Sequence, residues 1–198
     1  MRFISTALFF PILLAACASA PTISPQRPVP VEVSKTFSAC SAESKRPWLA
    51  SVVAAGKSNT RPLEALVSDF VGGSQADRNR ALTYLNDLRL KKYATEEDMA
   101  GAHFNACMAQ GKAEKFELTR SVRCYQEQRL LLVLEVMRFD GKASMADAMQ
   151  QMLAANPSAD ASTQAAIRRL AIDTYIILQP GDESAFAEAE FRVCMTDK

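Results

Sequence analysis

The stretch Phe104-Asn105-Ala106-Cys107-Met108 recurs near the end of the chain as Phe191-Arg192-Val193-Cys194-Met195. Cys40, in Phe37-Ser38-Ala39-Cys40, precedes the first stretch, and Cys124 precedes the second. The two cysteine pairs therefore enclose segments of nearly equal length. Self-similarity of this kind is the signature of an internal repeat.

Each enclosed segment begins with an apolar helical pattern, at 40–55 and at 124–139. The run Leu130–Met137 resembles a buried strand when taken alone, but its length with its flanks and Glu135 within it favour a helix. Both patterns end at a Gly-Lys pair, Gly56-Lys57 and Gly141-Lys142. We expect these glycines to adopt the left-handed conformation that commonly ends a helix.

Three further helical patterns follow in the same order in both segments. The second has a single apolar face in each copy: Leu63, Leu66, Val67, Phe70 and Val71, then Met145, Ala148, Met149, Met152 and Leu153. Ser144 and Asp147 resemble a capping box. The third pattern places Ala81, Tyr84, Leu85 and Leu88 against Ile167, Leu170, Ala171 and Thr174. The fourth starts at acidic residues, which complement a helix dipole: Thr95-Glu96-Glu97-Asp98, then Pro180-Gly181-Asp182-Glu183.

The sequence thus predicts an all-α fold of two tandem four-helix units, at 36–110 and 120–198. For the linking segment 111–119, the sequence leaves open whether the helix continues.

The N-terminus has the three parts of a secretory signal: basic Arg2, the apolar run Phe3–Leu14, and small residues. The apolar run is too short to span a bilayer, which takes about 20 residues. An alternative cleavage site at Ala18-Ser19-Ala20 would leave Pro21 first, and proline fits an extended protease site poorly.

Leu14-Ala15-Ala16-Cys17 resembles the lipobox of bacterial lipoproteins. The resemblance implies a signal peptide at 1–16, removed to leave an acylated Cys17, and Ala18 after it implies the outer membrane. Several acyl chains make a stable anchor. We therefore expect a protein on the periplasmic face of the outer membrane, attached through lipid.

Residues 17–35 then form a tether with prolines at positions 21, 25, 28 and 30. Proline favours extended polyproline II, so the tether reaches about 50 Å. Spacing is its expected role, and the alternative is a proline-rich docking segment.

Four cysteines remain besides Cys17, and an even count in the periplasm favours two disulfides. The repeat pairs Cys40 with Cys107 and Cys124 with Cys194, which ties the first helix of each unit to its last. The alternative pairs Cys107 with Cys124 and Cys40 with Cys194.

Charge excludes one class of partner. The chain has 23 Lys and Arg against 22 Asp and Glu, and a neutral body argues against nucleic acid. Membrane attachment must then come from the lipid.

No motif predicts a catalytic, cofactor or metal site. His103 lies one helical turn before Cys107, but a nucleophile needs a free thiolate, and Cys107 is expected to be oxidised. Zinc has no ligand pattern. Ala55-Gly56-Lys57-Ser58 resembles the end of a phosphate-binding loop, but Ser51 stands where that loop needs glycine. Met137, Met145, Met149 and Met152 have the spacing of a helix core, although methionine faces also serve as binding grooves.

The second unit resembles short, single-copy helical proteins of bacteria and phages whose function is unknown. The shared features are the segment Gly141–Met152, Tyr175 and Cys194. The resemblance implies no catalytic residues.

We therefore expect an envelope lipoprotein that is a non-enzymatic protein-interaction module, serving assembly or inhibition of an envelope system. A small envelope hydrolase acting through carboxylates brought together from distant positions is one alternative, since the pairs Glu96-Glu97 and Asp182-Glu183 are typical of helix starts. A carrier with an apolar pocket between helices is the other.

Overall fold

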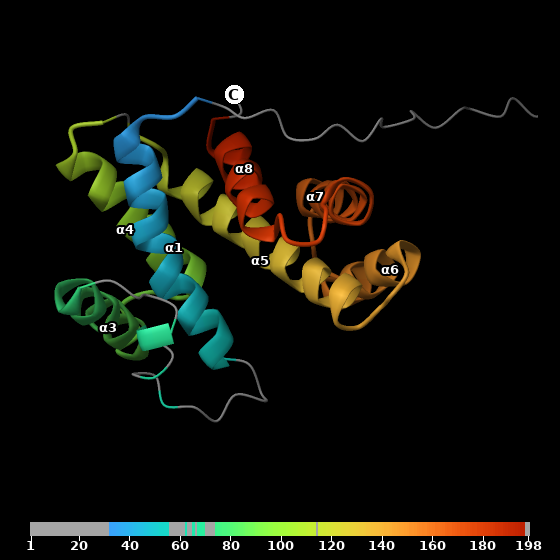
Figure 1. Ribbon diagram of the computed structural model, residues 1–198, viewed down its shortest axis with the longest axis horizontal. Coiled ribbons are helices and arrows are strands. Elements are labelled where there is room, and N and C mark those ends of the chain that lie inside the picture. Colours follow the sequence, from blue (N-terminus) through green and yellow to red (C-terminus); the bar gives the residue numbers. More distant parts are fainter. Residues whose placement is uncertain are drawn as a thin grey trace, which may run out of the picture.

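Figure 1 shows a chain of helices in which the long α5 runs from α1 and α4 on one side to α6 and α7 on the other. The computed structural model describes residues 32–55, 62, 65, 67–69, 74–113 and 115–196, and these contain no strand. The helices are α1 Lys35–Ala55, α3 Gln75–Arg89, α4 Glu96–Gln110, α5 Leu118–Phe139, α6 Met145–Ala155, α7 Ala161–Ile172, the π-helix η1 Asp173–Ile177, and α8 Glu183–Thr196.

Several predicted features lie outside the described residues. They are the signal peptide 1–16, Cys17, the tether as far as residue 31, Gly56-Lys57, and most of the second helical pattern of the first repeat. Val67 of that pattern is described, and it is buried against Ala81, Leu85 and Met99.

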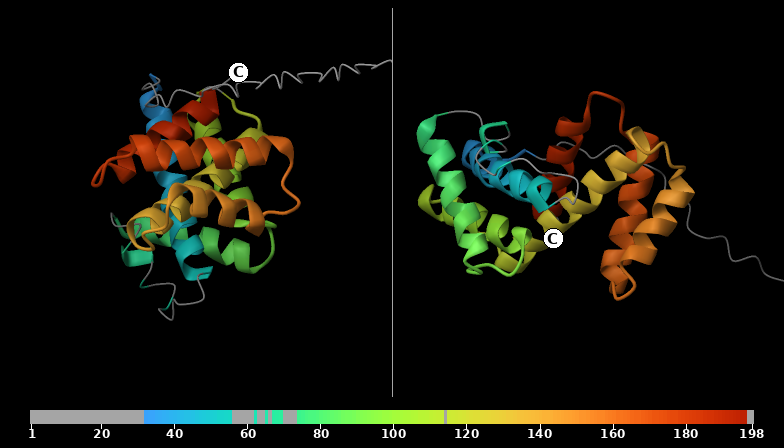
Figure 2. Two further views of the ribbon diagram at one scale, coloured as in Figure 1. Left: turned by 90° about the vertical axis from the view of Figure 1, so that its right-hand side faces the viewer. Right: turned by 90° about the horizontal axis from the view of Figure 1, so that it is seen from below.

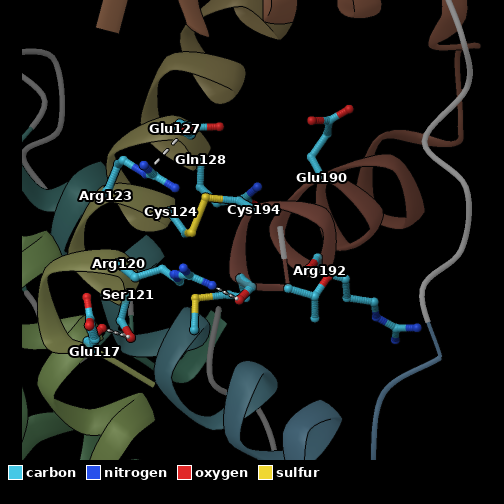
Figure 3. The surroundings of a disulfide bond; sticks show 12 residues. Glu117, Arg120, Ser121, Arg123, Cys124, Glu127, Gln128, Glu190, Arg192 and Cys194 are labelled. Carbon is cyan, nitrogen blue, oxygen red and sulfur yellow. Dashed lines mark hydrogen bonds and ion pairs between the residues drawn. A yellow bond between two sulfur atoms is a disulfide. The ribbon is translucent and has the colours of Figure 1, made fainter. Parts of the chain in front are cut away.

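The predicted all-α fold with two disulfide-closed units is confirmed. Cys40 of α1 is bonded to Cys107 of α4, with an S–S distance of 2.02 Å. Cys124 of α5 is bonded to Cys194 of α8, with an S–S distance of 2.05 Å (Figure 3). Each bond ties the first helix of a repeat to its last, as the repeat requires, and the alternative pairing through Cys107 and Cys124 is not formed.

The two repeats share their main hydrophobic core. Both disulfides lie in it, surrounded by aromatic and methionine side chains from α1, α4, α5 and α8: Phe37, Trp48, Phe104, Met108, Tyr125, Phe191 and Met195. The aromatic rings meet mostly edge to face or tilted, for example Phe37 with Phe104 at 5.2 Å between centroids. The disulfide-bonded helices therefore form the middle of the molecule.

The remaining helices form the two ends of the molecule (Figure 2). At one end α3 packs through Ala81 and Leu85. At the other, α6 and α7 bury a larger set against α5: Leu131, Leu134, Ala148, Met152, Ile167, Leu170 and Ala171. None of the helices in the described part of the chain is long and apolar enough to cross a bilayer.

One sequence expectation about a helix end needs correction, and one open question is settled. Gly141 does not take the left-handed conformation after α5; Lys142 does, with φ of 51°. The backbone at Gly141 packs closely on the preceding turn instead, because a Cβ there would lie 3.1 Å from the Met137 carbonyl oxygen. The linking segment does not continue α4, which ends at Gln110 before Lys112 with φ of 50°; its last two residues already belong to α5, which starts at Leu118.

Candidate functional site

Alignment of Cys40 with Cys124, and of Cys107 with Cys194, matches the helices of the two repeats position by position. It defines two comparable junctions. We name the meeting of α4 with α5 and α1 the closed junction, and the meeting of α8 with α1 and α5 the open junction.

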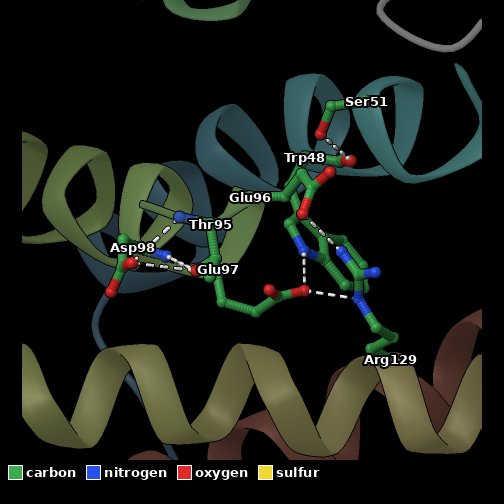
Figure 4. A network of polar contacts seen from close by, with 7 residues as sticks. All are labelled: Trp48, Ser51, Thr95, Glu96, Glu97, Asp98 and Arg129. Atoms are coloured by element: carbon green, nitrogen blue, oxygen red, sulfur yellow. Dashed lines mark hydrogen bonds and ion pairs between the residues drawn. The ribbon is translucent and has the colours of Figure 1, made fainter. Parts of the chain in front are cut away.

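The closed junction is filled by a polar network (Figure 4). Arg129 of α5 donates from Nε to Glu97 Oε1 at 2.6 Å and from Nη2 to Glu96 Oε2 at 2.8 Å. The indole Nε1 of Trp48 donates to the same Glu97 oxygen at 3.1 Å. Because Glu97 and Trp48 are almost fully buried, their polar atoms depend on these partners.

The start of α4 places both carboxylates of this network. The Thr95 hydroxyl accepts from the Asp98 N–H at 3.0 Å, and the Asp98 carboxylate accepts from the Thr95 N–H at 3.0 Å. This capping box fixes the first turn. Glu96 and Glu97 are in that turn, so they face Arg129 and also complement the helix dipole.

At the open junction the matching positions carry different side chains. Lys45 replaces Arg129, Glu183 replaces Glu96, Ser184 replaces Glu97 and Leu132 replaces Trp48. These residues line a solvent-open groove with a volume of about 170 Å³. Its other walls are mostly apolar: Trp48, Leu49, Leu131 and Ala187, with Gln128 and Glu135.

Gly101 explains why one junction is closed. A Cβ at Gly101 would lie 3.0 Å from Val122 Cγ2 and 3.1 Å from the Val122 backbone nitrogen, so only glycine lets α4 pack this closely on α5. Glu188 occupies the matching position of α8. Its carboxylate accepts from the Ser41 hydroxyl of α1 at 3.2 Å and from Arg192, so a long polar side chain lies between α8 and α1 where the closed junction has glycine.

The groove has an unusual acidic group at Glu135. Its Oε1 atom is buried and has no hydrogen-bond partner in the described part of the protein. Burial raises the pKa of Glu135 to about 7; Lys45 opposes this shift and the nearby Glu183 adds to it. Burial also lowers the pKa of Lys45, although Glu188 and Glu135 favour its charged form.

Glu183 differs from Glu135 in its surroundings. The Gly181 N–H donates to the Glu183 carboxylate at 3.0 and 3.1 Å, which lowers the pKa of Glu183. Among the described residues, Lys45 forms no ion pair within 4.0 Å. The groove thus combines an ionised carboxylate, a carboxyl that is half-protonated near neutral pH, and an amine that neither of them neutralises by contact.

Two smaller grooves lie at matching places between the first and third helices of the repeats. One, of about 140 Å³, is crossed by an ion pair between Glu43 and Arg80 at 2.5 Å. The other, of about 30 Å³, is lined by Glu127, which pairs with Arg169 at 2.8 Å. Since their central charges are already paired within the protein, these grooves offer less to a ligand than the open junction.

His103 and Cys107 do not form a catalytic pair, because Cys107 is in a disulfide. The His103 ring stacks on Tyr84 with 3.3 Å between centroids, and Tyr93 lies edge-on at 5.7 Å. Burial lowers the pKa of His103 to about 4. A neutral histidine in an aromatic contact is a packing residue.

The other sequence candidates also have structural places. Met137, Met149 and Met152 belong to the core at the α6–α7 end, as their helical spacing predicts, and none of the three grooves has a methionine in its wall. The segment Gly56-Lys57-Ser58 lies outside the described residues. The described part of the chain has no group of three or more His, Cys, Asp or Glu placed to hold a metal ion.

Sequence reasoning missed Lys45, Glu135 and Trp48 as groove residues. Position-by-position alignment of the repeats carries a signal for two of them, because it sets Lys45 against Arg129 and Glu135 against Ser51.

Comparison of the chain with protein-family models, with curated proteins and with solved structures finds no match in any of the three.

Proposed function

We propose that this chain is a lipoprotein of the outer membrane, held at the periplasmic face by an acylated Cys17, whose helical body binds another envelope protein. The body is stapled by two disulfides, which suits an oxidising compartment. Its near balance of 23 basic and 22 acidic residues leaves membrane attachment to the lipid. Assembly or inhibition of an envelope system fits such a binding role.

The open junction is the observation that carries this proposal. Its groove is smaller than the roughly 300–1,000 Å³ typical of small-molecule sites, and it is open to solvent. Such a groove suits one or two side chains presented by a protein partner. Apolar walls around a few polar groups are also the composition of an anchor pocket at a protein interface.

The hydrolase alternative gains one observation, which is that Glu135 and Glu183 line the same groove with different protonation tendencies. A carboxylic acid beside a carboxylate is the pair that glycoside hydrolysis uses. Release of soluble fragments from purified cell-wall material, abolished by Glu135→Gln, would favour this alternative. The carrier alternative has less support, since the methionines fill the core.

Photocrosslinking in intact cells tests the interaction role. A photoreactive amino acid at Leu49, in the groove wall, should give one discrete adduct with an envelope protein on irradiation. The same photoreactive amino acid at Leu90, an exposed apolar position directly after α3, is the matched control and should not give that adduct. Equal adducts from both positions, or none from the groove, would contradict the proposal.

A separate experiment tests the anchor. Palmitate should label the wild-type chain and should fail to label Cys17→Ser, which should also leave the outer-membrane fraction. Continued labelling of Cys17→Ser would show that the lipid is elsewhere or that the lipobox resemblance is misleading.

A further inference from the structure

The two junctions carry the same kinds of groups, but only one is internally satisfied. Each has two carboxylates: Glu96 and Glu97 at the closed junction, Glu135 and Glu183 at the open one. At the closed junction one guanidinium, from Arg129, bridges both carboxylates. At the open junction the matching cation is Lys45, which contacts neither.

The chemistry of the two cations explains this difference. A guanidinium is planar and has five donors, so it can hold two carboxylates at once while its flat face and stem lie against apolar side chains. A lysine ammonium is compact and strongly hydrated, and it keeps water where it can. Lys45 therefore leaves the buried Oε1 of Glu135 without a donor.

The groove also has the shape for the missing group. Leu131, Leu132 and Trp48 line the groove as an apolar wall for a methylene stem, and Glu135 and Glu183 line the same groove, near enough for the charge of Glu183 to raise the pKa of Glu135. The buried edge of Trp48, whose other side faces the Arg129 network, is shared by both junctions.

From this comparison we infer that the open junction receives an arginine side chain of the partner protein, which takes the part that Arg129 plays at the closed junction. The inference rests on the proposed interaction function and names its recognition chemistry. The partner's guanidinium donates to Glu135 and Glu183, and its stem covers the apolar wall.

Binding of short peptides to the full-length acylated protein in mild detergent tests this inference. The probe is a capped pentapeptide with a central arginine between alanines, and matched peptides carry lysine or citrulline there. Trp48 is the single tryptophan of the chain and lines the groove, so its fluorescence reports occupancy. The arginine peptide should change the emission in a saturable way, the lysine peptide should bind more weakly, and citrulline should have no effect.

Charge removal in the groove provides the matched variants. Glu135→Gln should lower the affinity for the arginine peptide by about five-fold, because a hydrogen bond between two charged groups becomes one with a neutral acceptor. Asp140→Asn changes the same charge at the exposed end of α5 and should leave binding unchanged. Equal binding of arginine and citrulline, or equal binding by Glu135→Gln and wild type, would overturn the inference.

The photocrosslink from position 49 separates this inference from the proposed function. If the adduct forms in wild type and is lost in a Glu135→Gln/Glu183→Gln variant, the interaction function and the arginine inference are both supported. If the adduct persists in that variant, the interaction role stands and the arginine inference is overturned. If guanidinium chloride changes Trp48 emission at low concentration but the arginine peptide does not, a free small cation is the ligand and the inference is again overturned.

Discussion

The closed and open junctions of this molecule are made from matching helices, yet one is filled and the other is a groove. Gly101 brings α4 onto α5, and Arg129 then neutralises two carboxylates against Trp48. Glu188 and Lys45 stand at the matching positions of the other repeat, and there a volume of about 170 Å³ stays open. Few side-chain differences therefore separate a structural contact from a candidate binding site.

The comparison also shows what the repeats keep in common. Both repeats retain the disulfide between their first and last helices and an ion pair from the first helix to the third. Both also keep a buried phenylalanine three residues before the second cysteine, Phe104 in one repeat and Phe191 in the other. The shared features hold each unit together, whereas the differing ones lie where the units meet. Divergence at the junctions is thus the place to look for function.

The largest expected effect is loss of a disulfide. Cys40→Ala/Cys107→Ala and Cys124→Ala/Cys194→Ala each open a loop whose ends are 67 or 70 residues apart. Each should lower the free energy of unfolding by about 4 kcal/mol in the chain-entropy account. Denaturant unfolding measures this, and a difference above about 2 kcal/mol between the two pairs would break the equivalence of the repeats.

Arg129→Met should have the second-largest effect on stability, and this effect should distinguish the closed junction from the open one. It leaves the buried Glu97 carboxylate without its cation, which should cost about 2–3 kcal/mol of unfolding free energy. Lys45→Met is the matched change at the open junction and should cost less than about 0.5 kcal/mol, since no ion pair is broken. Similar losses in the two variants would contradict the assignment of closed and open junctions.

Gly101→Ala should have a smaller effect. Its new Cβ would meet the backbone nitrogen of Val122, and the clash should outweigh the helix propensity of alanine, for a net loss of roughly 1–2 kcal/mol. Glu188→Ala, at the matching position, introduces no clash and should cost about 1 kcal/mol, because the buried Ser41 hydroxyl loses its acceptor. Thermal unfolding of both variants measures the difference. If Gly101→Ala were as stable as wild type, α4 and α5 could move apart without cost.

The smallest expected effect concerns pH. The pKa of Glu135 is raised to about 7 in the folded protein, so the folded state binds more protons than the unfolded state between about pH 4.5 and 7. Stability from this group therefore falls as the pH rises through that window. Glu135→Gln removes the dependence and should be more stable than wild type above pH 7, by about 1 kcal/mol after allowance for solvent screening.

Denaturant unfolding from pH 5 to pH 8 gives the difference between wild type and Glu135→Gln. Asp140→Asn serves as the control and should follow the wild-type curve. A difference that does not change with pH would contradict the buried, partly protonated state of Glu135.

Much of the fold follows from local patterns in the sequence. The cysteine spacing, the apolar faces and the acidic helix starts predict α4 to α8 and the disulfide pairing, because each depends on residues close in sequence or on a repeat. The left-handed glycine expected at 141 was wrong, since Lys142 takes that conformation. A Gly-Lys pair alone does not say which of its residues turns the chain.

The groove could not be predicted in the same way. It depends on how α8 packs against α1, where Glu188 meets Ser41, a residue far away in the sequence. The run Leu130–Met137 illustrates the limit: it reads as uniformly buried, yet Val133 and Val136 are exposed while Leu131 and Leu134 are in the core. Which face of α5 is covered is a property of the assembled helices.

Photocrosslinking from position 49 in a Lys45→Arg/Ser184→Glu variant tests directly whether the open groove is the binding site. These changes give the open junction the cation and the carboxylate of the closed one. The new arginine should fill the groove, the variant should be at least as stable as wild type, and the adduct with the envelope partner should disappear. A stable variant that retains the adduct would contradict the claim that the groove is the binding site.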